Sequence, residues 1–136
     1  MRWFKRLIFW WRRSRRPVSL GRRGEHEAAR FLKRRGYIIV ARGDRARLGE
    51  IDLVAVDRRT VVFVEVKTRT SHDAGHPAEA VDRNKQRRLT RAARGFLQRH
   101  DLGNNAARFD VIAVTWPDER QRPVVEHFQN AFEAAD

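Results

Sequence analysis

The sequence predicts an α/β fold with a mixed sheet, its elements in the order α-β-β-β-α-β-β. Three observations predict it. The chain has 136 residues, which is enough for one domain and short for two. Two long segments carry apolar residues at helical spacing, and short runs rich in β-branched residues fill the rest. We expect one domain over residues 18–136, preceded by an extension at 1–17.

The first four elements have clear boundary signals. Ser19 is expected to cap a helix that runs to Arg35, where Gly36 stops it. A short apolar strand follows at 37–41. Two further strands, at 50–56 and 61–67, are joined by the turn 57–60, which has the length of a hairpin connection.

The second half is predicted in the same way. A helix is expected from Glu79 to about His100, with apolar residues at 81, 89, 92, 93, 96 and 97. Strands are expected at 108–116 and 124–128. Trp116, directly before Pro117, is expected to cover the core at a turn.

The charge of the chain indicates a polyanionic partner. Thirty Lys and Arg against seventeen Asp and Glu give +13, with a pI near 11.6, which favours nucleic acid or an acidic membrane surface. The chain has no cysteine, which excludes disulfides, thiolate zinc sites, iron–sulfur clusters and thiol catalysis. This composition suits a reducing compartment, and we expect a cytoplasmic protein.

The segment 1–23, which includes the extension, holds much of the excess charge, because it carries nine basic side chains and no acid. Its longest apolar run, 7–11, has five residues, against about 20 for a membrane span and about 7–15 for a signal-peptide core. Two interpretations stay open. Residues 1–16 form a basic amphipathic helix on an anionic membrane or nucleic acid, or they are a partly disordered tail.

The hairpin places two acids opposite each other. If its turn centres on residues 58 and 59, Asp52 faces Glu65, Glu50 faces Lys67, and Val54 faces Phe63. Like charges directly opposed across strands are destabilising. A hard cation such as Mg²⁺ or Mn²⁺ between Asp52 and Glu65 would remove that cost.

Three more charged residues point to the same place. Lys67 shares the face of Glu65 and could orient or deprotonate a water, so metal and lysine together outline a hydrolytic site. Glu25 and Lys85 interrupt the apolar faces of the two helices, where an unpaired charge is costly. The alternative is structural: Lys67 or an arginine neutralises Glu65, and Glu50–Lys67 is an ordinary ion pair.

A basic stripe on the second helix is a candidate nucleic-acid contact. Arg83, Arg87, Arg91 and Arg94 fall at i, i+4, i+8 and i+11, where they could follow phosphates or simply form a solvated face. Lys85 and Arg69 complete the residues that we expect to contact nucleic acid.

Several motifs occur together in a fixed order: GRRGEHEAARFLKRRGY (21–37), GEIDLVAVD (49–57), VVFVEVKTR (61–69), Gly75 with Pro77, Lys85 and RFDVIAV (108–114). With these motifs the sequence resembles the bacterial family UPF0102 (YraN-like) from about residue 21 to 132. That family is similar to the PD-(D/E)XK nucleases, among them Holliday-junction resolvases.

The resemblance implies a restriction-endonuclease-like αβββαβ core with helices flanking the sheet. It also implies Asp52 and Glu65 as Mg²⁺ ligands, Lys67 as the residue that assists water, Glu25 as the helix acid, and a homodimer by analogy with resolvases. This sequence departs from the pattern twice: Ile51 stands in place of a proline, and Gly43 stands where asparagine is expected.

Two functions therefore remain open. The first is a Mg²⁺-dependent nuclease acting on DNA, with branched and single-stranded forms as candidate substrates. The second is a nucleic-acid-binding module without turnover, with membrane contact through the extension as an addition.

Overall fold

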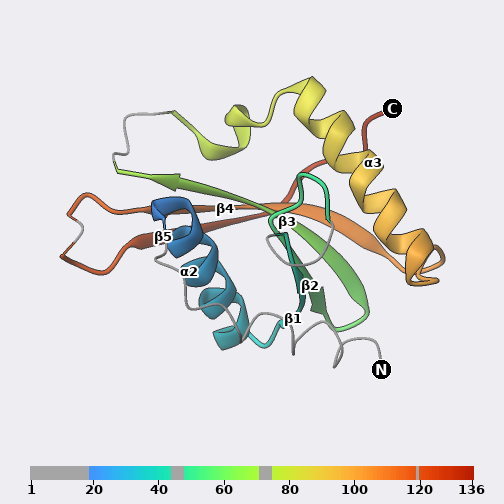
Figure 1. The fold of residues 1–136 in the computed structure, drawn as a ribbon, viewed down its shortest axis with the longest axis horizontal. Coiled ribbons are helices and arrows are strands. Elements are labelled where there is room, and N and C mark those ends of the chain that lie inside the picture. The colour runs from blue at the N-terminus through green and yellow to red at the C-terminus, as the bar shows by residue number, and fades with distance from the viewer. Residues whose placement is uncertain (1–18, 44–47, 71–74, 119) are drawn as a thin grey trace.

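A mixed five-stranded sheet with a helix on each face forms the protein (Figure 1). The computed structural model describes residues 19–43, 48–70, 75–118 and 120–136; the predicted extension at 1–17 lies outside them. The described elements are α2 (Leu20–Arg34), β1 (Ile38–Arg42), β2 (Leu53–Asp57), β3 (Thr60–Arg69), the 3₁₀ turn η3 (Pro77–Ala80), α3 (Arg83–Arg99), β4 (Ala107–Thr115) and β5 (Val124–Phe132).

The sheet has the strand order β1-β2-β3-β4-β5. Only β3 and β4 pair in parallel, and α3 makes the crossover between them; the other neighbours are antiparallel. This confirms the predicted fold class and the predicted order of elements.

Helix α2 begins and ends where the sequence predicted. The Ser19 hydroxyl accepts a hydrogen bond from the backbone N–H of Arg22 at 3.3 Å, which satisfies one of the free donors of the first turn. Gly36 follows the last turn with φ of 88°, a left-handed conformation that favours glycine.

The predicted hairpin register is confirmed. Val54 pairs with Phe63, and Asp57 pairs with Thr60. The register is therefore the one that brings Asp52 toward Glu65. The paired ladder ends at Leu53 and Val64, so Asp52 lies just before the strand rather than within it.

Three boundaries differ from the prediction by three residues or more. Strand β2 starts at Leu53 and not at residue 50. Helix α3 starts at Arg83 and not at Glu79, because the Asp82 carboxylate accepts from the backbone N–H of Lys85 at 2.8 Å and caps the helix there. The four preceding residues form η3. The last strand continues to Phe132, beyond the predicted 128.

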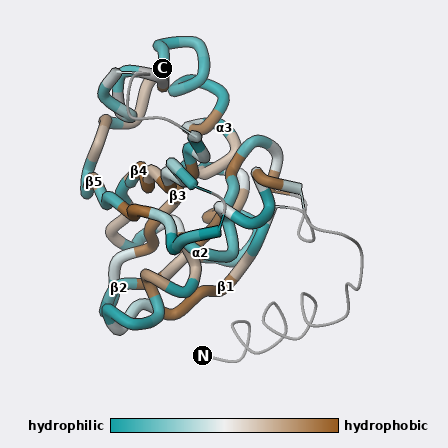
Figure 2. The backbone as a smooth tube through the Cα atoms, turned by 90° about the vertical axis from the view of Figure 1, so that its left-hand side faces the viewer, coloured by the Kyte–Doolittle hydropathy of each residue, from teal (hydrophilic) through white to brown (hydrophobic). Residues whose placement is uncertain are grey.

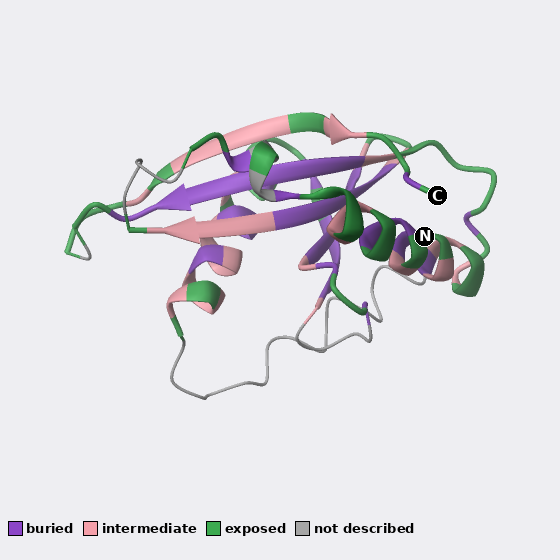
Figure 3. Ribbon diagram, turned by 90° about the horizontal axis from the view of Figure 1, so that it is seen from above, coloured by how far each residue is buried: buried purple, intermediate pink, exposed green. Residues whose placement is uncertain are grey.

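The core consists of two apolar layers, one on each face of the sheet. Alternate residues of β2 and β3 supply each layer: Val54 and Phe63 pack with Leu89 and Phe96 of α3, whereas the other face packs on α2. The most apolar stretches of the tube lie in the strands (Figure 2). Strand β4 is buried along most of its length, whereas β5 is only partly covered (Figure 3).

Among the residues that the structure describes, no helix is long and apolar enough to cross a membrane. Trp116 is buried directly after β4, as the sequence predicted.

Candidate catalytic and metal site

The charged residues of the candidate site lie around the C-terminal half of β3. Asp52 enters from the segment before β2, Glu65 and Lys67 from β3, and Lys85 from the first turn of α3. The Asp52 carboxylate accepts a hydrogen bond from the backbone N–H of Val66 at 2.8 Å, which fixes the aspartate beside the strand that carries Glu65.

Glu65 is a buried carboxylate whose negative charge is only weakly compensated by neighbouring positive charges. Its side chain is 7% exposed, and the ammonium groups of Lys67 and Lys85 each lie 3.8 Å from one of its oxygens. Both distances exceed those of charge-assisted hydrogen bonds, which are about 2.7–2.9 Å. Among the described residues, Oε2 of Glu65 has no hydrogen-bond partner. A buried acceptor in this state is costly unless a proton or a cation joins it.

The pKa values of Glu65 and Asp52 also indicate that the negative charge of these acids is poorly compensated. Burial first, and then the charge of Asp52, raises the pKa of Glu65 to about 7, against the smaller opposing effects of Lys85 and Lys67. Burial also raises the pKa of Asp52, although the Val66 N–H, Lys85 and Glu25 act in the opposite direction. The pair therefore resists carrying two negative charges.

Glu25 reaches this pair from α2. It lies close enough to Asp52 to act on that carboxyl group, where its effect is to lower the Asp52 pKa against the effect of burial.

Gly24 explains how α2 comes so close. A Cβ at Gly24 would overlap the Oγ1 of Thr68 on β3, so only glycine permits this approach of helix and strand. This role of Gly24 was not predicted from the sequence. The signal was the glycine that directly precedes the inward-facing acid Glu25 in GRRGE.

Glu50 does not pair with Lys67 as the hairpin register predicted. The ladder stops at Leu53, so Glu50 turns toward α3 and lies 2.9 Å from Arg88 and 3.3 Å from Lys85. The hydrogen bond from Arg88, together with Lys85, lowers the pKa of Glu50. Lys85 thus lies between an exposed acid and the buried Glu65.

The residues present fit a hard divalent cation. Mg²⁺ is usually held by one or two carboxylates, with water or substrate phosphate completing its shell, and Asp52 and Glu65 supply that set. Within the described ranges, no group of three or more His, Cys, Asp or Glu side chains is placed to hold a metal. Glu25 would therefore act on Asp52 rather than as a third ligand.

The residues predicted to contact nucleic acid lie in different surroundings. Arg83, Arg87, Arg91 and Arg94 are all exposed on α3, as a contact stripe requires. Two of them also contact the C-terminal residue Asp136: Arg94 at 2.8 Å and Arg87 at 3.2 Å. Arg69 donates to the carbonyl of Gly75 at 2.7 Å, which ties the end of β3 to the following loop.

Comparisons with known proteins show which family the chain belongs to. A model of the uncharacterised protein family UPF0102 matches residues 24–114. The chain belongs to the UPF0102 family. A UPF0102 protein of Rhodopirellula baltica is 51% identical over 86% of this chain and 72% of its own length. One from Chlorobium phaeobacteroides is 46% identical over 85% and 95%, and one from Geobacter metallireducens is 49% identical over 86% and 94%.

This UPF0102 chain departs from the family pattern at Ile51 and Gly43, and the structure shows the surroundings of both residues. Ile51 is a buried core residue of the layer beneath α3. The backbone N–H of Gly43 donates to the carbonyl of Asp52 at 2.8 Å, and a Cβ at Gly43 would overlap the carbonyl of Ile51. In this backbone a side chain at position 43 does not fit.

This UPF0102 protein has a second buried acid that was not predicted from the sequence. Asp110 on β4 is fully buried, and His127 lies 2.7 Å from its Oδ2. Arg108 donates to the other oxygen at 3.0 Å, as does the backbone N–H of Asn130 at 2.9 Å. The available signal was an aspartate within an otherwise apolar strand, in RFDVIAV.

Proposed function

We propose that this UPF0102 protein is a metal-dependent nuclease that hydrolyses phosphodiester bonds in nucleic acid, with DNA favoured over RNA. The observation that supports this most is the state of Glu65: a buried carboxylate with an oxygen that lacks a hydrogen-bond partner among the described residues, a pKa near 7, and a second acid beside it. Strongly shifted acids in such a setting are typical of functional sites.

Each charged residue has a role in this proposal. Asp52 and Glu65 would hold Mg²⁺ or Mn²⁺, which when bound supplies a Lewis acid and lowers the pKa of a water. Lys67 is 30% exposed and 3.8 Å from Glu65, so its ammonium group can orient a water or stabilise negative charge on the phosphate. Glu25 would support Asp52 from α2, where it acts to lower the Asp52 pKa.

The nucleic acid would approach from the side of α3. Lys85 is partly exposed and lies near both the exposed Glu50 and the buried Glu65. The exposed arginines of α3 continue from there and could bind phosphates of a duplex arm or of a single strand. Arg69 extends the same basic surface at the end of β3.

The test is cleavage of single-stranded, duplex and branched DNA by the full chain in Mg²⁺. We expect cleavage that EDTA abolishes, and a loss of at least about 100-fold in Asp52→Asn, Glu65→Gln and Lys67→Met. Glu133→Gln removes an exposed acid and serves as the matched control, with activity near wild type. Calorimetry should detect Mg²⁺ binding to the wild type but not to Glu65→Gln. No cleavage of any substrate would reject the proposal.

The second candidate is a nucleic-acid-binding module without turnover. It is favoured by the four exposed arginines of α3, which could bind phosphates without any metal. In that case Asp52→Asn has no activity to lose, whereas Arg83→Glu and Arg87→Glu still weaken binding. A nuclease gives the converse: Asp52→Asn loses cleavage and keeps binding.

Membrane contact through residues 1–16 and a homodimer stay predictions. Liposome sedimentation of the full chain against a chain that begins at Val18 tests the first. Light scattering tests the second.

A further inference from the structure

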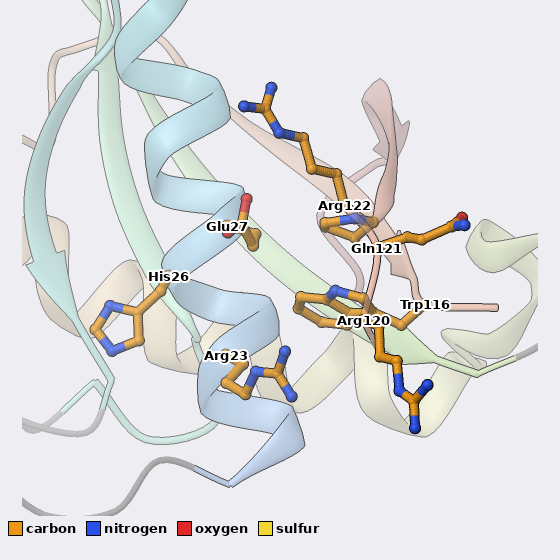
Figure 4. Close-up of a pocket in the computed structure, with 8 residues that line it drawn as sticks. Arg23, His26, Glu27, Trp116, Arg120, Gln121 and Arg122 are labelled. Atoms are coloured by element: carbon orange, nitrogen blue, oxygen red, sulfur yellow. The ribbon is translucent and has the colours of Figure 1, made fainter. Parts of the chain in front are cut away.

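A second basic site lies beside α2, where Arg23, His26 and Glu27 of that helix line it (Figure 4). It is a pocket of about 340 Å³, open to solvent, between the start of α2 and the segment that joins β4 to β5. This volume is at the lower end of the range for small-ligand sites, about 300–1,000 Å³. The proposed nuclease chemistry does not use it.

Three arginines dominate the walls. Arg23 comes from α2, and Arg120 and Arg122 come from the β4–β5 segment. The guanidinium of Arg23 lies 4.9 Å from the centroid of the buried Trp116 ring. That cation–π contact fixes the direction of Arg23, so this arginine is ordered before any ligand arrives.

The charges of the lining residues favour a doubly charged anion. Glu27 is the one acid among them, and it lies 3.7 Å from Arg30 outside the pocket. Three arginines against one acid leave an excess of two positive charges. A terminal phosphate monoester carries about −1.5 to −2 at pH 7, whereas a phosphodiester within a strand carries only one negative charge. Arginine is also the side chain best shaped for phosphate, through paired N–H donors.

Both walls are joined directly to the strand that carries the candidate catalytic residues. Gly24, next to Arg23, packs on Thr68 of β3. The backbone N–H of Trp116 donates to the carbonyl of Arg69 at 2.8 Å. Arg69 follows Lys67 by two residues on the same strand, about 7 Å along it. The pocket and the acids therefore lie at the same end of the sheet.

We propose that this pocket binds the terminal phosphate of a nucleic-acid strand whose neighbouring nucleotides reach the acids at the end of β3. The proposal rests on the proposed function, because it takes the ligand to be nucleic acid. It makes the protein selective for strands with a phosphorylated end. Arg23 and Arg122 hold the phosphate from opposite walls, and Trp116 holds Arg23.

The experiment measures binding without turnover. The full chain is titrated in EDTA against internally labelled single-stranded oligonucleotides of one sequence, with a 5′-phosphate, a 3′-phosphate or hydroxyls at both ends, and anisotropy is recorded. The variants are Arg23→Ala, Arg122→Ala and Arg122→Lys. Arg34→Ala is the matched control, since Arg34 is an exposed arginine in the last turn of the same helix. Melting temperatures establish that each variant is folded.

We expect about tenfold tighter binding of one phosphorylated oligonucleotide by the wild type and by Arg34→Ala. The preference should fall to about twofold or less in Arg23→Ala and Arg122→Ala, and Arg122→Lys should be intermediate because lysine lacks the paired donors. Equal binding of all three oligonucleotides overturns the proposal, as does a preference that survives in every pocket variant.

Competition identifies the source of the phosphate. Adenosine monophosphate and inorganic phosphate should displace the oligonucleotide only at far higher concentration than the phosphorylated strand does. Displacement by the free nucleotide at equal concentration would show a nucleotide-binding pocket instead and overturn the assignment to a strand end. A phosphate preference without any Mg²⁺-dependent cleavage would reject the nuclease and keep the pocket. Cleavage without the preference would do the reverse.

Discussion

Two buried acids in one sheet, Asp110 and Glu65, are in opposite electrostatic states. Asp110 accepts hydrogen bonds from His127, Arg108 and the backbone of Asn130 at 2.7–3.0 Å. Burial acts to raise the pKa of Asp110, but these donors outweigh burial and lower it. Glu65 has two lysines at 3.8 Å, and its pKa rises to about 7. The fold supplies close hydrogen-bond donors to Asp110, but it does not supply them to both oxygens of Glu65.

This difference separates a structural acid from one that is available to a ligand. A buried carboxylate whose oxygens already accept several hydrogen bonds is not available to a ligand. Removing it leaves its donors buried without an acceptor. A buried acid without close donors weakens the fold and persists only if something else selects for it. Three predictions test this contrast, from the largest expected effect to the smallest.

The largest expected effect is on stability. Asp110→Ala should lower the free energy of unfolding by about 3–5 kcal/mol, because it leaves Arg108 and His127 buried without their acceptor. Glu65→Gln should leave stability unchanged or raise it at pH 8, because it removes one of two repelling charges. Urea unfolding followed by circular dichroism measures both. Equal losses in the two variants would contradict the contrast.

The second prediction concerns pH. Glu65 has a pKa of about 7 in the folded state against 4.5 for an unperturbed glutamate, so between these values the folded state binds the extra proton. Wild-type stability should therefore fall by about 3 kcal/mol as pH rises from 4.5 to 7. The contribution of Asp110 has the opposite sign, because its pKa is lowered. That contribution is present above pH 3.8 and is lost as pH falls through the lowered pKa.

In Glu65→Gln, the free energy of unfolding should change little between pH 4.5 and 7. The loss of stability below pH 4, which comes from Asp110, should remain. The measurement is the unfolding free energy of both proteins at each pH in EDTA. Parallel curves for wild type and variant would show that Glu65 does not titrate near neutrality.

The smallest effect concerns the approach of α2 that brings Glu25 to Asp52. Gly24→Ala should cost about 1–3 kcal/mol, since its Cβ would overlap Thr68. Thr68→Ala in the same chain should recover part of that loss by removing the nearest atom. Gly21→Ala is the control, because no atom lies within 4 Å of a Cβ built there. A neutral Gly24→Ala would show that the helix is free to move away.

Much of the candidate site could be predicted from local patterns. The turn at 58 and 59 fixes the register of β2 and β3, and the period of two along a strand then brings Asp52 and Glu65 to one face. The interrupted apolar faces of the helices pointed to Glu25 and Lys85. What could not be predicted was where the ladder stops. That point sends Glu50 to Lys85 and Arg88 rather than to Lys67.

The sequence alone determined the order of elements, the hairpin register and the set of charged residues that the core has to accommodate, because each of these depends on neighbours along the chain. Only the tertiary structure decided which buried acids find donors. Asp110 meets His127 across two strands, and Gly24 meets Thr68 across helix and sheet. Such contacts join residues far apart in the chain, and their distances follow from the packing of whole elements rather than from any local pattern.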